Sequence, residues 1–152
     1  MLRALLPLAA ALILAAPAAA AGTAAVSRSA LLLEMNRVRA EYGLPELALD
    51  VRLQRAARAH SRAMLASGTF EHGDLASRMI RFDVAGSVAG ENLAWGTGDR
   101  GSAQYIVLAW LQSPGHRANL LRADFTRVGI ADLVGSFQGR GGAHVVTADF
   151  AG

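Results

Sequence analysis

The sequence predicts an α+β domain whose sheet is antiparallel. Apolar residues at helical spacing occupy the first part of the chain, and segments with the twofold alternation of strands come last. A single extended segment, residues 93–96, lies between these two groups. This order differs from the regular alternation of strand and helix that builds a parallel sheet. Because the chain has no internal repeat and no low-complexity linker, we expect one folded domain.

The N-terminus has the pattern of an export signal. Arg3 supplies a positive charge, residues 4–16 are apolar, and alanines at 18–21 provide the small side chains that a signal peptidase needs. The apolar run is short for a membrane-spanning helix and is not followed by stop-transfer charges. We therefore predict export to the periplasm or the medium, with no transmembrane segment in the mature chain. The predicted parts are a signal peptide over 1–21, a flexible leader over 22–28 and a folded domain over 29–152.

The composition narrows the classes of function. The chain has no cysteine. It contains fifteen basic residues, all of them arginine, and twelve acidic residues, which gives a formal charge of +3. An exported protein without disulfides is typical of bacterial envelopes and culture media. The arginines are scattered, without a basic run interleaved with aromatic residues, so we expect no nucleic-acid partner.

Two amphipathic helices are predicted at the start of the folded domain. The first, capped by Ser27 or Ser29, should end at about Tyr42, and the second should cover residues 51–67 with Asp50 as its N-cap. Side chains at helical spacing should form the buried stripe of each helix. They are Leu31, Met35, Val38 and Tyr42 on the first helix, and Leu53, Ala57, His60 and Met64 on the second.

The middle of the chain combines short elements with one strongly apolar helix. We expect a short helix over 75–82, a brief strand or a loop over 84–88, and an extended segment over 93–96. Ser102 opens the apolar helix, which ends at residues 113–115 because proline cannot continue it and glycine permits a sharp turn. Since this helix is apolar on nearly every side, we expect it to be packed between layers.

Two strands close the chain. Residues 127–134 and 143–150 alternate as strands do, and the glycine-rich segment 135–142 should be the hairpin loop between them. His144, near that loop, is expected to be a residue of the strand face. The two strands account for the antiparallel sheet of the predicted class.

Two histidines and one glutamate stand beside glycines at predicted turns. They are His72, His116 and Glu91. Two imidazoles and a carboxylate can bind a divalent cation and leave a position for water, or the carboxylate can orient a histidine that acts as a general base. Spacing alone also allows each histidine to cap a turn while Glu91 accepts backbone N–H groups. The chain contains no His-Glu-x-x-His, no Gly-x-Ser-x-Gly, no phosphate loop and no cysteine nucleophile.

Three segments that carry these residues occur in a characteristic order. They are Phe70-Glu71-His72, Gly90-Glu91-Asn92-Leu93-Ala94-Trp95 and Trp110-x-x-Ser113-Pro114-Gly115-His116-Arg117-x-Asn119-Leu120-Leu121. With them the chain resembles the CAP superfamily, also called SCP/TAPS, in its short bacterial secreted form, over about residues 31–150. The resemblance implies an α-β-α sandwich with a three- to four-stranded antiparallel sheet between helical layers. It also implies a cleft with two histidines and two acids, which binds a divalent cation in some members.

The resemblance assigns roles to particular residues. His72, Glu91 and His116 become the candidate metal ligands and the candidate catalytic residues, with zinc as the expected cation and no organic cofactor. The family's second acid falls three residues after Trp110, where this chain has Ser113. We therefore expect weak metal binding, because one anionic partner is missing. The expected cleft-lining residues are Asn92, Trp95 and Ser113.

Two functions from different classes follow from the resemblance. The favoured hypothesis is a non-enzymatic module whose cleft binds a lipid, a cell-envelope fragment or a partner protein, together with a weakly held divalent cation. The alternative is a metal-dependent hydrolase or peptidase that uses a cation bound by His72, Glu91 and His116. The incomplete acidic set and the lack of a positioned nucleophile favour the first hypothesis.

Overall fold

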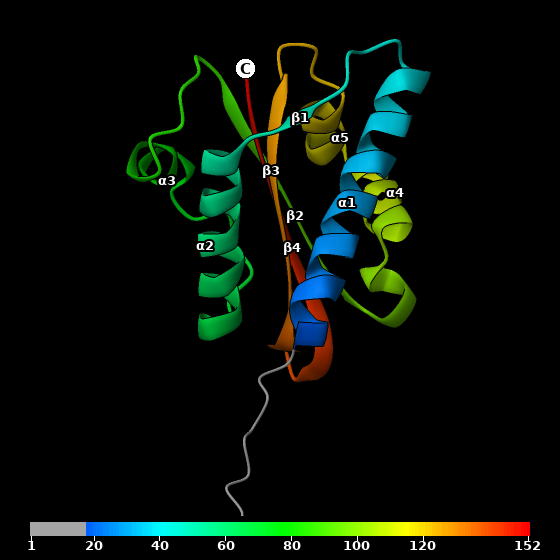
Figure 1. Ribbon diagram of the computed structural model, residues 1–152, viewed down its shortest axis with the longest axis vertical. Helices are drawn as coiled ribbons and strands as arrows, with labels where there is room; N and C mark the ends of the chain where they lie inside the picture. The colour runs from blue at the N-terminus through cyan, green and yellow to red at the C-terminus, as the bar shows by residue number, and fades with distance from the viewer. Residues whose placement is uncertain (1–17) are drawn as a thin grey trace, which may run out of the picture.

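Helices cover both faces of a four-stranded sheet in the computed structural model, which describes the backbone of residues 18–152 and the side chains of residues 28–152. The α-helices are α1 (Ala18–Glu41), α2 (Val51–Ser67), α3 (Leu75–Arg81), α4 (Ala103–Gln112) and α5 (Pro114–Leu120), with a 3-10 turn, η1, at Gly98–Gly101. The strands are β1 (Ala48–Leu49), β2 (Ala89–Thr97), β3 (Arg127–Phe137) and β4 (Arg140–Ala151). Helices α2 and α3 cover one face of the sheet, and α1, α4 and α5 cover the other (Figure 1). The predicted α-β-α sandwich is confirmed.

The sheet has the order β1-β3-β4-β2, so β2 is an edge strand. Both long pairings, β3 with β4 and β4 with β2, are antiparallel as expected. The two-residue strand β1 was not predicted, and it pairs in parallel with the start of β3. The sheet is therefore antiparallel except at this edge.

The β3–β4 hairpin is longer than the sequence suggested. Its strands continue into the glycine-rich segment predicted as a loop, and the turn is only Gln138-Gly139, with φ of 50° and 73°. Positive φ at both central residues is the geometry of a type I′ turn, which matches the twist of a hairpin. An irregularity between Gly135 and Phe137 absorbs the extra residue beside the turn.

The first helix begins earlier than expected. It starts at Ala18 and runs through residues 22–28, where the sequence predicted a flexible leader. The alanines of this segment favour helix more strongly than the serine caps favour a boundary. Residues 1–17, which hold most of the predicted signal peptide, lie outside the described residues, and the signal peptide remains a prediction.

Helix α4 belongs to an outer layer, which corrects the expectation that it lies between layers. Its buried side chains, Ile106, Val107 and Trp110, form one stripe, whereas Tyr105 and Leu108 are 44% and 52% exposed. Apolar composition alone did not distinguish these two faces. Among the described residues, no helix combines the length and the apolar character needed to cross a membrane.

Trp110 fixes α4 to the edge strand of the sheet. Its buried indole Nε1 donates to the carbonyl of Leu93 on β2, at 2.9 Å. Replacing Trp110 with Phe should lower the free energy of unfolding by about 2 kcal/mol, because a buried acceptor loses its donor and part of the ring volume is lost. Urea denaturation would measure the loss. The half-buried Trp95 provides a matched control, and Trp95→Phe should cost clearly less; equal losses would contradict the argument.

Close packing brings α2 against the sheet on the opposite face. Gly129 on β3 lies directly under the α2 backbone, and a Cβ placed there would come within 2.0 Å of the carbonyl carbon of Leu53. On the same face, Ser61 Oγ of α2 lies 2.8 Å from Thr147 Oγ1 of β4. Glycine at position 129 therefore allows α2 to lie close to the sheet. This close approach buries the polar side chains of Ser61 and Thr147 between helix and sheet.

Candidate functional site

Two acidic side chains lie opposite each other on neighbouring strands under α2. Glu91 on β2 pairs in register with Asp149 on β4, so both side chains project from the same face of the sheet. The Glu91 side chain is 2% exposed and the Asp149 side chain is fully buried. Gly129 is the partner of Asp149 on β3, and its lack of a side chain leaves the space that α2 fills. The fold thus buries a carboxylate pair, with Glu91 on the edge strand β2 and Asp149 on its neighbour β4.

A single arginine from α3 serves both carboxylates. The Nη2 atom of Arg78 donates to Glu91 Oε2 and lies 3.3 Å from Asp149 Oδ1. Its Nη1 atom donates to the carbonyl of His72 at 3.3 Å. In the described part of the chain, Asp149 Oδ2 and Arg78 Nε have no hydrogen-bond partner. One positive charge therefore faces two buried acids.

Burial changes the protonation of this pair. Removal from water raises the pKa of Glu91 to about 7, although Arg78 opposes the rise. Burial likewise raises the pKa of Asp149 to about 7, and the neighbouring Glu91 charge adds to the effect. Because two carboxylates with one guanidinium between them favour a retained proton, we describe Glu91 and Asp149 as a pair that shares a proton near neutral pH.

Two histidines approach Glu91 from different elements. His72, in the segment before α3, places Nδ1 at 2.7 Å from Glu91 Oε1, while its side chain remains 59% exposed. His60 on α2 is buried, with Nε2 at 2.8 Å from the carbonyl of Glu71 and 3.6 Å from Glu91 Oε2. Burial is the main cause that lowers the pKa of His60, which is consistent with a neutral ring. The expectation that His60 belongs to the buried stripe of α2 is confirmed, but His60 also belongs to the surroundings of Glu91.

His116 reaches the same edge from the opposite helical layer. It lies in α5, a helix that the sequence did not predict, because Pro114 was interpreted only as a stop although proline also suits the first turn of a helix. Asn92 donates to the carbonyl of His116 at 2.9 Å, and Asn119 of α5 donates to the carbonyl of Glu91 at 2.9 Å. These two amides fasten α5 to β2. Burial is the larger cause that lowers the pKa of His116, and the charge of His72 is the smaller one.

The three predicted site residues meet around the edge of β2. The rings of His72 and His116 have centroids 6.4 Å apart, and His72 is bonded to Glu91. With Nδ1–H of a neutral His72 donated to Glu91, the free lone pair of His72 is on Nε2. Within residues 28–152, no group of three or more histidine, cysteine, aspartate or glutamate side chains is arranged to hold a metal ion. The donors available to a cation are therefore the two imidazoles, with Glu91 behind His72.

The three residues expected to line the cleft occupy different places. Asn92 is fully buried and donates to the His116 carbonyl, so it positions the His116 backbone and does not line a surface cleft. Trp95 follows Glu91 by four residues along β2, about 13 Å away, and its ring packs edge-on against Phe137 at 5.6 Å. Ser113 is the residue between α4 and α5, three positions before His116.

Sequence reasoning missed Arg78 and Asp149. The twofold alternation puts Asp149 on one strand face with Thr147, but it does not show that helices cover both sides of the sheet. A charged residue between Ala148 and Phe150 in the last strand was the available signal. Arg78 gave no comparable signal, since its role depends on how α3 is placed. Asp149, which comes from β4, contacts the site through Arg78.

The sandwich and its edge site define a class of protein. The sheet between two helical layers, with His72 bonded to Glu91 and the His116 ring close to His72, agrees with the sandwich and the pair of histidines that the CAP resemblance implies. The model of the CAP, or cysteine-rich secretory protein, family matches residues 32–150, and the chain belongs to this family.

Known relatives support this assignment. The uncharacterized protein YkwD of Bacillus subtilis (strain 168) is 35% identical over 100 residues, which are 62% of this chain and 38% of YkwD. The chain thus spans well under half of that relative. An extracellular SCP-domain protein from Bacillus anthracis str. Ames is 27% identical with a TM-score of 0.75, covering 90% of this chain and 44% of that protein. An outer surface protein from Borrelia burgdorferi has the same fold, with 22% sequence identity and a TM-score of 0.70. The match covers 82% of this chain and 91% of the Borrelia protein.

Proposed function

We propose that this protein is an exported, non-enzymatic binding module whose edge cleft holds a divalent cation weakly and receives a cell-envelope component or a partner protein. The observation that carries the proposal is that His72 bonds to Glu91 and that the ring of His116 lies nearby, with its centroid 6.4 Å from that of His72. The extracellular and outer-surface relatives support export. The apolar N-terminal run is the feature of the chain itself that supports export.

The donor set suits a weakly bound transition metal. Imidazole nitrogen is a good ligand for zinc, and two such ligands leave positions for water or for a group of the bound partner. Glu91 accepts the other ring N–H of His72, which fixes the tautomer and orients the ring, as carboxylates commonly do behind metal-bound histidines. The bound cation would supply a positive charge and an open coordination position at the surface. We assign ligation to His72 and His116, and positioning to Glu91.

Metal-assisted hydrolysis is the less favoured function. It requires a base beside the water that the cation activates. Glu91 is the acid that contacts His72, and its oxygens are engaged by His72 and Arg78. The orientation of Glu91 thus suits support of His72 better than abstraction of a proton from water.

Zinc titrations at pH 8 would test the cation site. His72→Ala and His116→Ala should each weaken zinc binding by at least tenfold, because each removes one of two ligands, and Glu91→Gln should weaken it by roughly tenfold through the orientation of His72. Ser113→Glu should strengthen binding by adding an anionic group near His116. Isothermal titration calorimetry, with urea denaturation to confirm folding, would measure these changes.

His144 offers a matched control for these variants. It is a histidine whose Nδ1 lies 2.9 Å from Asp132, and it is five positions along β4 from Asp149, the register partner of Glu91, so His144→Ala should leave zinc affinity unchanged. Lowering the pH should weaken binding to the wild type, since a protonated imidazole cannot ligate. Equal affinity of the His72→Ala, His116→Ala and His144→Ala proteins would refute the proposed site.

A further inference from the structure

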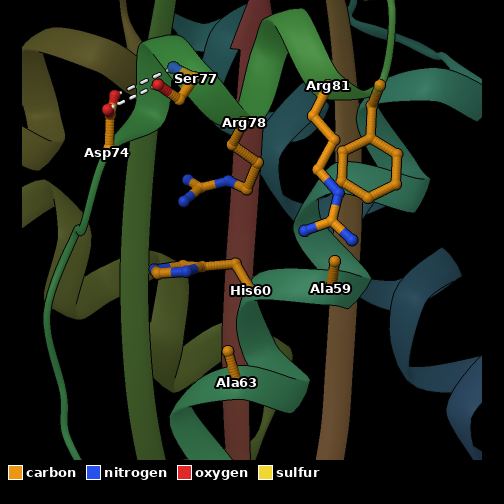
Figure 2. Close-up of a pocket in the computed structure, with 8 residues that line it drawn as sticks. Ala59, His60, Ala63, Asp74, Ser77, Arg78 and Arg81 are labelled. Carbon is orange, nitrogen blue, oxygen red and sulfur yellow. Dashed lines mark hydrogen bonds between the residues drawn. The ribbon is translucent and has the colours of Figure 1, made fainter.

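We propose that a second ligand site lies between α2 and α3, and that it takes a small monocarboxylate with a compact apolar group. A cavity of about 270 Å³ opens between these helices (Figure 2), which lie on the face of the sheet opposite α5 (Figure 1). An apolar cavity of about 150 Å³ is large enough for benzene, so this volume accommodates a ring with a short charged arm. The lining residues are Ala59, His60, Ala63, Asp74, Ser77, Arg78, Arg81 and Phe82.

The cavity has an apolar floor and a cationic side. Ala59 and Ala63 lie one helical turn apart on α2, and their small side chains leave the space that the cavity occupies (Figure 2). Arg81 extends from α3 toward Ala59, with its guanidinium over the ring of Phe82 at 5.6 Å. Apart from this ring contact, the Arg81 guanidinium has no hydrogen bond or ion pair with any residue that the structure describes. Its N–H donors are available to a ligand.

Charges around the cavity favour an anion. Two arginines of α3, Arg78 and Arg81, line the cavity together with a single acid. The acid that lines the cavity, Asp74, is engaged by Ser77, which donates its backbone N–H at 2.9 Å and its hydroxyl at 2.7 Å. Asp74 also lies on the side away from Arg81 (Figure 2). The ligand's charged end therefore belongs beside Arg81.

The number of arginine side chains that are available to a ligand determines the charge that the ligand should carry. Arg78 also lines the cavity, but its guanidinium points with the His60 ring toward β2 and contacts Glu91 and Asp149. One guanidinium remains for the ligand, and its planar fork matches the two oxygens of a carboxylate. The apolar part of the ligand would pack on Ala59, Ala63 and the Phe82 ring. These features select a monocarboxylate over a dianion or a neutral molecule.

Phenylacetate and its neutral analogue phenylacetamide are suitable probes. In NMR titrations of the full folded domain, phenylacetate should shift the methyl signals of Ala59 and Ala63 with a dissociation constant on the order of 1 mM, as expected for a ligand of this size. Phenylacetamide should bind at least tenfold more weakly, because it cannot form the ion pair. Equal binding of the two probes, or no methyl shift at the highest soluble concentration of phenylacetate, would refute the proposal.

Three surface substitutions locate the site. Arg81→Gln should reduce phenylacetate binding to the level of the amide, and Ala63→Leu should block both probes by filling the floor. Arg55→Gln is the matched control, since it removes an exposed arginine of α2 that does not line the cavity. If Arg81→Gln and Arg55→Gln weakened binding alike, the effect would be general surface charge and the site would be rejected. Unchanged binding by Ala63→Leu would also reject it.

Discussion

Replacing Arg39 with Met should lower the free energy of unfolding by about 4 kcal/mol or more. The Arg39 side chain is fully buried near the end of α1 and donates to four backbone carbonyls at 2.9–3.0 Å. The acceptors are the carbonyls of Pro45, Leu120, Arg122 and Phe125. A methionine fills part of the volume but leaves these buried acceptors without donors, and each loss of a charged hydrogen bond is costly. Urea denaturation followed by circular dichroism would measure the change.

Arg37 provides a matched control for this experiment. It lies on the same helix but is exposed, and it pairs with Glu34 and Glu41 across one helical turn. Exposed ion pairs contribute little, so Arg37→Met should leave the urea midpoint nearly unchanged. If Arg39→Met does not fold, Arg39→Lys, which keeps the charge but reaches fewer carbonyls, should still unfold at lower urea than the wild type. A normal midpoint for Arg39→Lys would contradict the proposed role.

Local signals made some elements predictable from the sequence. Helix α2 has the predicted bounds because the side chain of Asp50 accepts from the backbone of Arg52 and Leu53, and because Gly68 adopts a left-handed conformation at the other end. These caps depend only on neighbouring residues. The grouping of His72, Glu91 and His116 followed from motif order, since nothing in their spacing showed that β2 is the edge strand.

The remaining features depend on contacts between distant segments. The strand β1 exists because its two residues pair with the start of β3. Ala48 is in register with Arg127, which lies 79 positions later in the sequence. The exposure of Leu108 depends on which side of α4 meets the sheet. The partnership of Glu91 with Asp149 requires the β2–β4 register, which no local pattern encodes. Sequence reasoning therefore found both histidines and Glu91, but not Arg78 and Asp149, the buried charges that accompany Glu91.

That buried acid pair should make stability depend on pH. The pKa of Glu91 and that of Asp149 are each raised to about 7, so the folded protein keeps a proton that the unfolded chain releases above about pH 4. Stability from this source is complete at acidic pH and is lost as the pH rises through about 7. His60 and His116 act in the opposite direction, because their lowered pKa values make stability rise with pH near 6.5. A profile of the wild type alone would mix these contributions.

Asp149→Asn separates the acid pair from the histidines. The substitution keeps the shape of the side chain and leaves Glu91 with Arg78 as a simple ion pair, while both histidines remain. From pH 5 to pH 9, the free energy of unfolding of the variant should therefore rise by about 3 kcal/mol relative to that of the wild type. This is the magnitude expected when burial raises the pKa of one carboxyl group to about 7. Urea denaturation at successive pH values would measure the difference between the two profiles.

Asp74→Asn is the control for this comparison. Asp74 is an exposed helix cap whose pKa is lowered by hydrogen bonds from Ser77, so it is ionised throughout this range in both the folded and the unfolded state. Its profile should run parallel to that of the wild type, displaced by a constant amount. If the Asp149→Asn profile were also parallel to the wild type, Glu91 and Asp149 would not share a proton in this range. Their burial would then have to be balanced by Arg78 alone.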